Sequence, residues 1–140
     1  MKYQIPHILL VEDDQLDVIN VQRSLSKINL THKLLVAKNG EEALALLKGE
    51  GAEKLPSLPD IIMLDINMPK MDGLEFLGIL RTEDTFKDIK VFIMTTSNEA
   101  EDIEASRRLG ISGYIVKPLS LNSSCKDSFS LLIDLMNLKN

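Results

Sequence analysis

The stretch from Asp60 to Pro69 constrains the fold more than any other part of this chain, because it contains an unbroken apolar run, Ile61 to Leu64, followed directly by Asp65. A strand with one face in water would alternate apolar and polar side chains, so this run predicts a central strand buried on both faces. Ligands of open α/β sheets bind beyond the carboxyl ends of the strands. Asp65 is therefore a candidate site residue, and the interpretation that it only caps the turn before Pro69 stays open at this point.

Length and composition predict one acidic, soluble domain spanning residues 1–140. The formal charge of −5 disfavours nucleic acid as a partner, because phosphate backbones are bound by basic surfaces. The single cysteine, Cys125, cannot form an internal disulfide, which fits a reducing compartment. The chain starts without an apolar signal segment and has no run near the roughly 18 residues that span a bilayer. We therefore expect a cytoplasmic protein that does not bind a membrane.

Short apolar runs alternate with amphipathic segments along the chain. Strands are expected at 7–11, 33–37, 61–64, 91–94 and 114–116, and helices at 16–25, 41–48, 73–82 and 99–109, with a last helix whose apolar stripe begins at Phe129. Asp14 and Asp72 are the expected N-caps of the first and third helices, with Asp17 near the positive end of the first. The expected apolar stripe of that first helix consists of Leu16, Ile19, Val21 or Gln22, and Leu25.

Five successive strand–helix units predict a doubly wound α/β fold, a parallel sheet with right-handed crossovers and helices on both faces. The segment 49–59, with two glycines and two prolines, is expected to be a mobile loop.

The expected strands end in polar residues that should meet, since all strands of a parallel sheet end at one edge. These residues are Glu12, Asp13, Asp65, Thr95 and Lys117. Three neighbouring carboxylates repel one another unless a cation offsets their charge, and oxygen ligands without a histidine or cysteine cluster favour Mg²⁺. Each residue also has a purely structural interpretation, as a helix cap, a strand end or a solvated cation. Their coincidence at one edge favours a site.

This set of groups suits phosphoryl transfer to an aspartate. Asp65 would attack phosphorus, and Mg²⁺ with Lys117 would stabilise the negative charge of the transferring oxygens. The Thr95 hydroxyl would donate a hydrogen bond to one of those oxygens. The predicted chemistry is therefore formation of an acyl phosphate on Asp65.

The sequence resembles the receiver domain of two-component response regulators from about residue 6 to at least residue 119. The resemblance is carried by Ile8-Leu-Leu-Val-Glu-Asp13, Ile62-Met-Leu-Asp65 with Met68-Pro69 and Met71-Asp-Gly73, Met94-Thr95-Thr96, and Gly113-Tyr-Ile-Val-Lys-Pro118. It implies a flavodoxin-like (βα)5 fold with strand order 2-1-3-4-5. The protein would promote only its own phosphorylation and dephosphorylation, and would not be an enzyme acting on other substrates.

The resemblance also implies a role for each site residue. Asp65 would be the phosphoacceptor, and Mg²⁺, replaceable by Mn²⁺ or Ca²⁺, would be bound by Asp13, Asp65, the backbone carbonyl of Asn67 and, through water, Glu12. The phosphoryl group would be bound by Thr95, Thr96 and Lys117. Thr95 and Tyr114 would form the switch that alters the face of the fourth helix, fifth strand and fifth helix, with Tyr114 rotating inward from solvent. Pro69, Gly73 and Pro118, in a cis peptide with Lys117, would be structural.

The partners implied are a histidine kinase or histidine phosphotransfer protein, an unidentified downstream protein, and a second copy of the chain in a homodimer. The loop length and the absence of an output domain make the chain similar to stand-alone regulators paired with bacterial phytochromes and other sensor kinases. The delayed apolar stripe after Pro118 departs from many receivers and leaves the output face undefined.

Three other functions are weighed against a receiver. A phosphohydrolase with an aspartate nucleophile needs a second acid two positions after it, where this chain has Asn67. A flavodoxin-like electron carrier needs a phosphate loop after the first strand, where Glu12, Asp13 and Asp14 would repel phosphate. An interaction module that works without phosphorylation stays open.

Overall fold

The computed structural model describes residues 5–28, 32–50, 58–68, 71–96, 100–117, 119, 130–131 and 134. Its elements, in chain order, are β1 (His7–Val11), α1 (Gln15–Lys27), β2 (Lys33–Ala37), α2 (Gly40–Leu47), β3 (Ile61–Leu64), α3 (Gly73–Thr82), β4 (Lys90–Thr95), α4 (Ala100–Leu109) and β5 (Gly113–Val116). Every expected strand is present. Their bounds differ from the expected ones by one residue at most.

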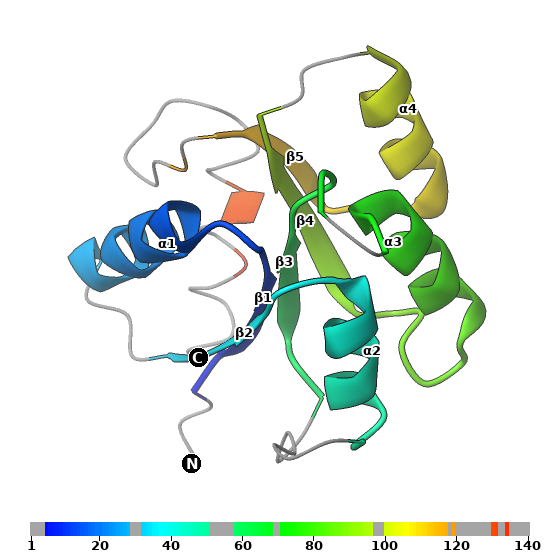
Figure 1. Ribbon diagram of the computed structural model, residues 1–140, viewed down its shortest axis with the longest axis horizontal. Helices are drawn as coiled ribbons and strands as arrows, with labels where there is room; N and C mark the ends of the chain where they lie inside the picture. Colours follow the sequence, from blue (N-terminus) through cyan, green and yellow to red (C-terminus); the bar gives the residue numbers. More distant parts are fainter. Residues whose placement is uncertain are drawn as a thin grey trace.

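The strands form one parallel sheet in the order β2-β1-β3-β4-β5 (Figure 1). Strand β3 lies at its centre, and all four of its residues are buried, as the unbroken apolar run predicts. The doubly wound fold and the predicted strand order are thereby confirmed. All five carboxyl ends lie at the same edge of the sheet, which we call the carboxyl edge.

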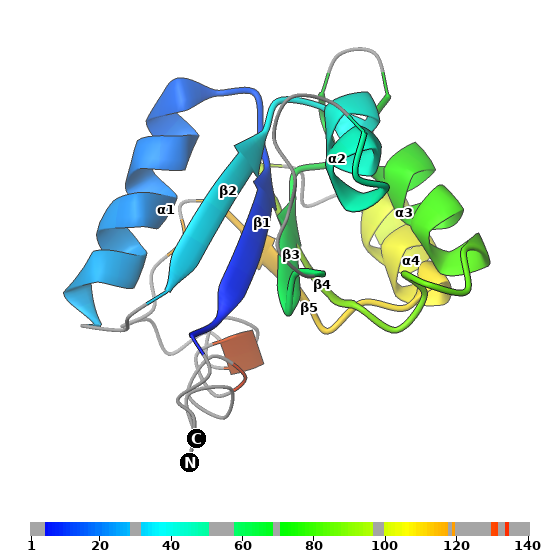
Figure 2. The same cartoon turned by 90° about the horizontal axis from the view of Figure 1, so that it is seen from below.

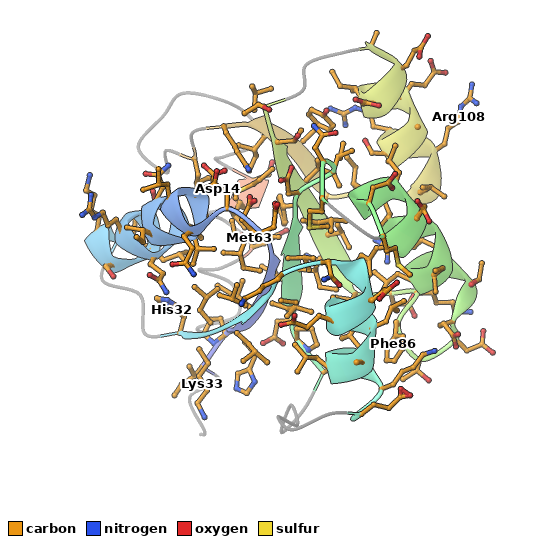
Figure 3. The ribbon with its side chains drawn as sticks, viewed as in Figure 1. Asp14, His32, Lys33, Met63, Phe86 and Arg108 are labelled. Atoms are coloured by element: carbon orange, nitrogen blue, oxygen red, sulfur yellow. The ribbon has the colours of Figure 1, made fainter. Side chains whose placement is uncertain are left out.

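The helices lie on both faces of the sheet, and two apolar cores result (Figures 1 and 2). Helix α1 covers one face, where Met63 of β3 packs with Val21 and Leu25. Helices α2, α3 and α4 cover the other face, where Phe76 and Phe86 belong to the second core. Figure 3 shows Met63 between α1 and the sheet, and Phe86 on the side of α2 and α3. Alternation along the central strand therefore supplies both cores.

The helices begin at the predicted capping residues. Asp14 accepts hydrogen bonds from the backbone N–H groups of Leu16 and Asp17, and Asp72 accepts one from that of Glu75. Gly110 directly follows the last residue of α4 and has a φ of +91°, a left-handed conformation that glycine adopts readily. Capping therefore fixes where α1 and α3 start, directly beyond the carboxyl edge.

The buried stripe of α1 matches the predicted one at Val21 and Leu25 but not at Leu16 and Ile19. Leu16 is 77% exposed and Ile19 is 39% exposed, whereas Val21 and Leu25 are buried. The helix is rotated so that positions 17, 21 and 25, spaced by four, face the sheet. Leu16 and Ile19 lie outside this stripe, so their predicted burial is wrong.

Some predictions fall outside the described residues. They concern residues 51–57 of the expected loop and the start of the last helix, although residues 130, 131 and 134 are helical. Within the part of the chain that the structure describes, no helix is long and apolar enough to cross a membrane.

Candidate functional site

Backbone hydrogen bonds continue the sheet one residue past three strands and thereby fix the candidate site residues. The N–H of Glu12 donates to the carbonyl of Ala37 at 2.9 Å, and that of Asp65 donates to the carbonyl of Val11 at 3.0 Å. The N–H of Lys117 donates to the carbonyl of Thr95 at 2.8 Å. These side chains are thus held by the rigid sheet, at the ends of β1, β3 and β5.

Three carboxylates lie together at the carboxyl edge. Glu12, Asp13 and Asp65 each offer one oxygen within 4.8 Å of the others, with Glu12 and Asp65 buried and Asp13 exposed. The second oxygen of Glu12 accepts a hydrogen bond from the N–H of Asp14 at 3.2 Å. Burial raises the pKa of Glu12 to about 7; contact with Lys117 lowers it, and the charge of Asp65 raises it. The predicted convergence of the acidic residues is therefore observed.

The ammonium of Lys117 lies among these carboxylates. Its Nζ is 2.5 Å from Glu12 Oε1, 2.7 Å from Asp17 Oδ2 and 3.4 Å from Asp65 Oδ2. Burial lowers the pKa of Lys117, but contact with the carboxylates of Asp17 and Glu12 outweighs that effect, so its pKa is raised above the usual value. Lys117 is therefore a fixed positive charge next to Asp65.

Thr95 and Asn67 complete the surroundings of Asp65. The N–H of Asn67 donates to Asp65 Oδ1 at 3.3 Å, and its side-chain amide lies 3.5 Å from the Thr95 hydroxyl. Thr95 is fully buried, whereas Thr96 is exposed. Asn67 therefore links the turn after β3 with the end of β4.

Gly73 fixes the turn after Asp65 against the start of α3. Its N–H donates to the carbonyl of Ile66 at 2.8 Å. A β-carbon on Gly73 would overlap the carbonyl oxygen of Asp65 and come within 2.7 Å of Ile66 Cα. Only glycine allows this close approach.

Tyr114 is buried, with 6% of its surface exposed, and belongs to the core on the α2–α4 side. The side chain is therefore already inside, and the expectation that it starts from solvent is not met. Tyr114 pairs with Ile93 in the register of β4 and β5, two residues before Thr95 on the neighbouring strand.

Two structural predictions lie outside the described residues. These are the role of Pro69 in the turn and the cis peptide between Lys117 and Pro118.

Asp17 is a site residue that the sequence alone does not identify, since its position predicts only an acid near the positive end of a helix. A signal was present: Asp17 precedes the apolar residues Val21 and Leu25 at a spacing of four. It therefore lies on the face of α1 that packs on the sheet, at the end of the helix nearest to the carboxyl edge.

The residues at this edge fit a divalent cation. Among the described residues, Glu12 Oε1 is buried without a hydrogen-bond partner of good geometry, although it forms the ion pair with Lys117. Three carboxylates with one ammonium leave excess negative charge, and hard oxygen ligands suit Mg²⁺ or a similar ion. The carboxylate oxygens of Asp13, Asp65 and Glu12 are therefore suited to hold a metal ion between them.

Comparison with known proteins identifies the protein family to which this chain belongs. Residues 8–126 match the family model described as the response regulator receiver domain, and the chain belongs to this family. Its described fold and its acidic site agree with that assignment.

Particular relatives are similar along most of the chain. The response regulator Rcp1 of Synechocystis sp. is 35% identical over 125 residues, which cover 89% of this chain and 82% of that protein. The structure of the phosphorylated cyanobacterial phytochrome response regulator RcpA superposes with a TM-score of 0.76 at 34% identity, covering 95% of this chain and 91% of that one. The Mn²⁺-bound structure of Rcp1 superposes with a TM-score of 0.75 at 32% identity, covering 92% of this chain and 89% of that one.

Proposed function

We propose that this chain acts as a single-domain response regulator, with residues 1–140 forming one cytoplasmic receiver. It accepts a phosphoryl group on Asp65 from a histidine kinase or a histidine phosphotransfer protein. The observation that carries the proposal is the convergence of Lys117 on Asp65, with Lys117 Nζ 3.4 Å from Asp65 Oδ2 beside the Glu12 and Asp13 carboxylates.

The residues of the chain have distinct parts in the reaction. One oxygen of Asp65 attacks phosphorus, while Lys117 offsets charge on the phosphoryl oxygens and the hydroxyl of Thr95 donates to one of them. The exposed Thr96 contributes a further contact to the phosphoryl group at the carboxyl edge. Asn67 orients Asp65 through its backbone N–H.

Asp13, Asp65 and the backbone carbonyl of Asn67 would hold Mg²⁺, with Glu12 acting through a water molecule. The bound cation supplies charge neutralisation at the phosphoryl oxygens. Mn²⁺ or Ca²⁺ would fit the same oxygen ligands. Similarity to a protein solved with Mn²⁺ supports this part of the proposal.

Phosphorylation would act on the rest of the domain through Thr95 and Tyr114. A phosphoryl group adds about −1.5 to −2 charges and strong acceptors, so it attracts the Thr95 hydroxyl. Tyr114 lies on the neighbouring strand and is buried. Movement of Thr95 would stabilise this inward position and alter the face of α4, β5 and the last helix, to which a downstream protein or a second copy would bind.

The test is reaction with acetyl phosphate and Mg²⁺, measured as the intact mass of the wild-type protein and of Asp65→Asn. Asp72→Asn is the matched control, because it removes a nearby carboxylate yet keeps a side chain that can cap α3. We expect one phosphoryl group on the wild type and on Asp72→Asn, and none on Asp65→Asn. Absence of an Asp65-dependent adduct, where a control receiver reacts, would refute the proposal.

A second measurement separates the receiver from a phosphohydrolase. The receiver should release phosphate only from its own acyl phosphate. Sustained turnover of a phosphate ester that is lost in Asp65→Asn would favour the hydrolase instead.

A further inference from the structure

The Lys117 ammonium is held nearer to helix α1 than to the proposed phosphoacceptor. Its Nζ donates a hydrogen bond to Asp17 Oδ2 at 2.7 Å and one to Asp65 Oδ2 at 3.4 Å. Asp17 and Lys117 are 100 positions apart, so only the fold brings them together. Asp17 thus shares the cation on which the proposed phosphoryl site depends.

Asp17 is fixed in place by its helix. Asp14 caps α1 and accepts hydrogen bonds from the N–H groups of Leu16 at 2.8 Å and of Asp17 at 3.4 Å. Val21 and Leu25, on the same face, anchor the helix in the core. The carboxylate of Asp17 therefore acts from a defined position.

The three carboxylates around Lys117 differ in exposure. The side chain of Asp17 is 31% exposed, against 1% for Glu12 and 7% for Asp65. An ammonium has three N–H donors, and all three carboxylates already lie within 3.4 Å of Lys117 Nζ. A phosphoryl group on Asp65 adds a stronger acceptor, so one present contact must weaken. Asp17 is the partner that water can solvate with the smallest penalty.

We propose that Asp17 is a positioning residue that draws Lys117 toward α1 and so competes with the incoming phosphoryl group for this ammonium. The inference rests on the proposed function, because it needs Asp65 to accept the phosphoryl group. Asp17 thereby limits how readily Asp65 is phosphorylated and how strongly the phosphorylated state is stabilised.

The test reaction transfers a phosphoryl group from acetyl phosphate to Asp65 and needs no other reactant. An oxygen of Asp65 forms a bond to the phosphorus of acetyl phosphate, the bond from phosphorus to the acyl oxygen breaks, and acetate leaves with the electron pair. Beryllofluoride forms the matching adduct on Asp65 without transfer chemistry. Acetyl phosphate therefore measures the rate of phosphorylation, and beryllofluoride measures the stability of the phosphorylated state.

The decisive comparison is between Asp17→Asn and Asp14→Asn. Both remove one carboxylate from the start of α1, and asparagine at position 14 still caps the helix, but only Asp17 contacts Lys117 in the described structure. We expect Asp17→Asn to be phosphorylated about three- to fivefold faster and to bind beryllofluoride more tightly by a similar factor, the size expected of a partly exposed ion pair. Asp14→Asn should stay within about 1.5-fold of wild type, since its charge is solvated.

Two further variants show whether the effect passes through Lys117. Asp17→Glu keeps the charge and should return the rate toward that of the wild type. In a Lys117→Gln background, Asp17→Asn should change beryllofluoride affinity no more than Asp14→Asn does, because the competed cation is gone.

The results separate this inference from the proposed function. A wild type that reacts, with Asp17→Asn no faster or with an equal gain in Asp14→Asn, would overturn the role of Asp17 alone. A gain that persists without Lys117 would also overturn it. A wild type with no Asp65-dependent adduct would overturn both.

Discussion

Gly73 packs directly against the backbone of Asp65, so that a β-carbon at position 73 would overlap the carbonyl oxygen of Asp65. This contact joins the first residue of α3 to the proposed phosphoacceptor. The position of Asp65 relative to α3 therefore depends on the absence of a side chain.

Replacing Gly73 by alanine should destabilise the domain by about 1–3 kcal/mol, because the added methyl group meets backbone atoms that cannot move independently. Urea unfolding measures the loss. Gly78→Ala is the matched control in the same helix, since a β-carbon there meets nothing within 4 Å. This control should gain about 0.5–1 kcal/mol from helix propensity. Equal effects of the two substitutions would contradict the packing argument.

Glu12 should make the metal-free protein less stable as the pH rises from 4.5 to about 7. Its pKa in the fold is about 7 against an ordinary value of 4.5, so the folded state binds this proton more tightly than the unfolded chain does. The stabilisation is fully present below pH 4.5 and is lost as the pH rises through 7, by up to about 3 kcal/mol. Unfolding of the wild type and of Glu12→Gln in EDTA, across this range, measures the difference.

In that comparison other carboxylates titrate in both proteins, so only the difference between the two carries the effect of Glu12. The wild type should lose stability relative to Glu12→Gln as the pH rises. A difference that stays constant with pH would show that Glu12 does not bind its proton more tightly in the fold.

Arg81 should be essential for the packing of α3 against the end of α4. Its guanidinium donates to the carbonyls of Leu109 and Gly110, and to those of Lys87 and Ile89, at 2.7–3.1 Å. Lysine cannot reproduce this planar set of donors, so Arg81→Lys should lower the free energy of unfolding by about 2–3 kcal/mol.

Arg108 provides the control for Arg81 on the neighbouring helix. It forms an exposed ion pair with Glu104 at 2.8 Å and points away from the core (Figure 3). Arg108→Lys should change the unfolding free energy by less than about 0.5 kcal/mol. Thermal or urea unfolding of both variants tests the contrast, and a loss in Arg81→Lys no larger than in Arg108→Lys would refute it.

Thr95→Ala should separate phosphoryl uptake from switching. The substitution keeps Asp65, Lys117 and the acidic residues, so an adduct with beryllofluoride should still form. The hydroxyl that would follow the phosphoryl group is gone, so the adduct-dependent change around Tyr114, read from its NMR signals, should shrink at least about threefold. An undiminished change at Tyr114 would rule out this coupling.

The sequence by itself determined the sheet and most of the site. The apolar runs of β1, β3 and β4 fixed the strands, and the polar residues directly after them had to meet because parallel strands end at one edge. Asp14 and Asp72 marked the helix starts through local hydrogen bonds. These features depend on neighbouring residues and on one topological rule, so they can be predicted without coordinates.

Only the tertiary structure decided how α1 is rotated against the sheet. One residue turns a helix by about 100°, so short apolar segments are compatible with more than one buried face. Packing selected Val21 over Gln22, exposed Leu16 and Ile19, and brought Asp17 to Lys117. The burial of Tyr114 was decided in the same way, because it depends on how the helices across the sheet fill space, which no local pattern encodes.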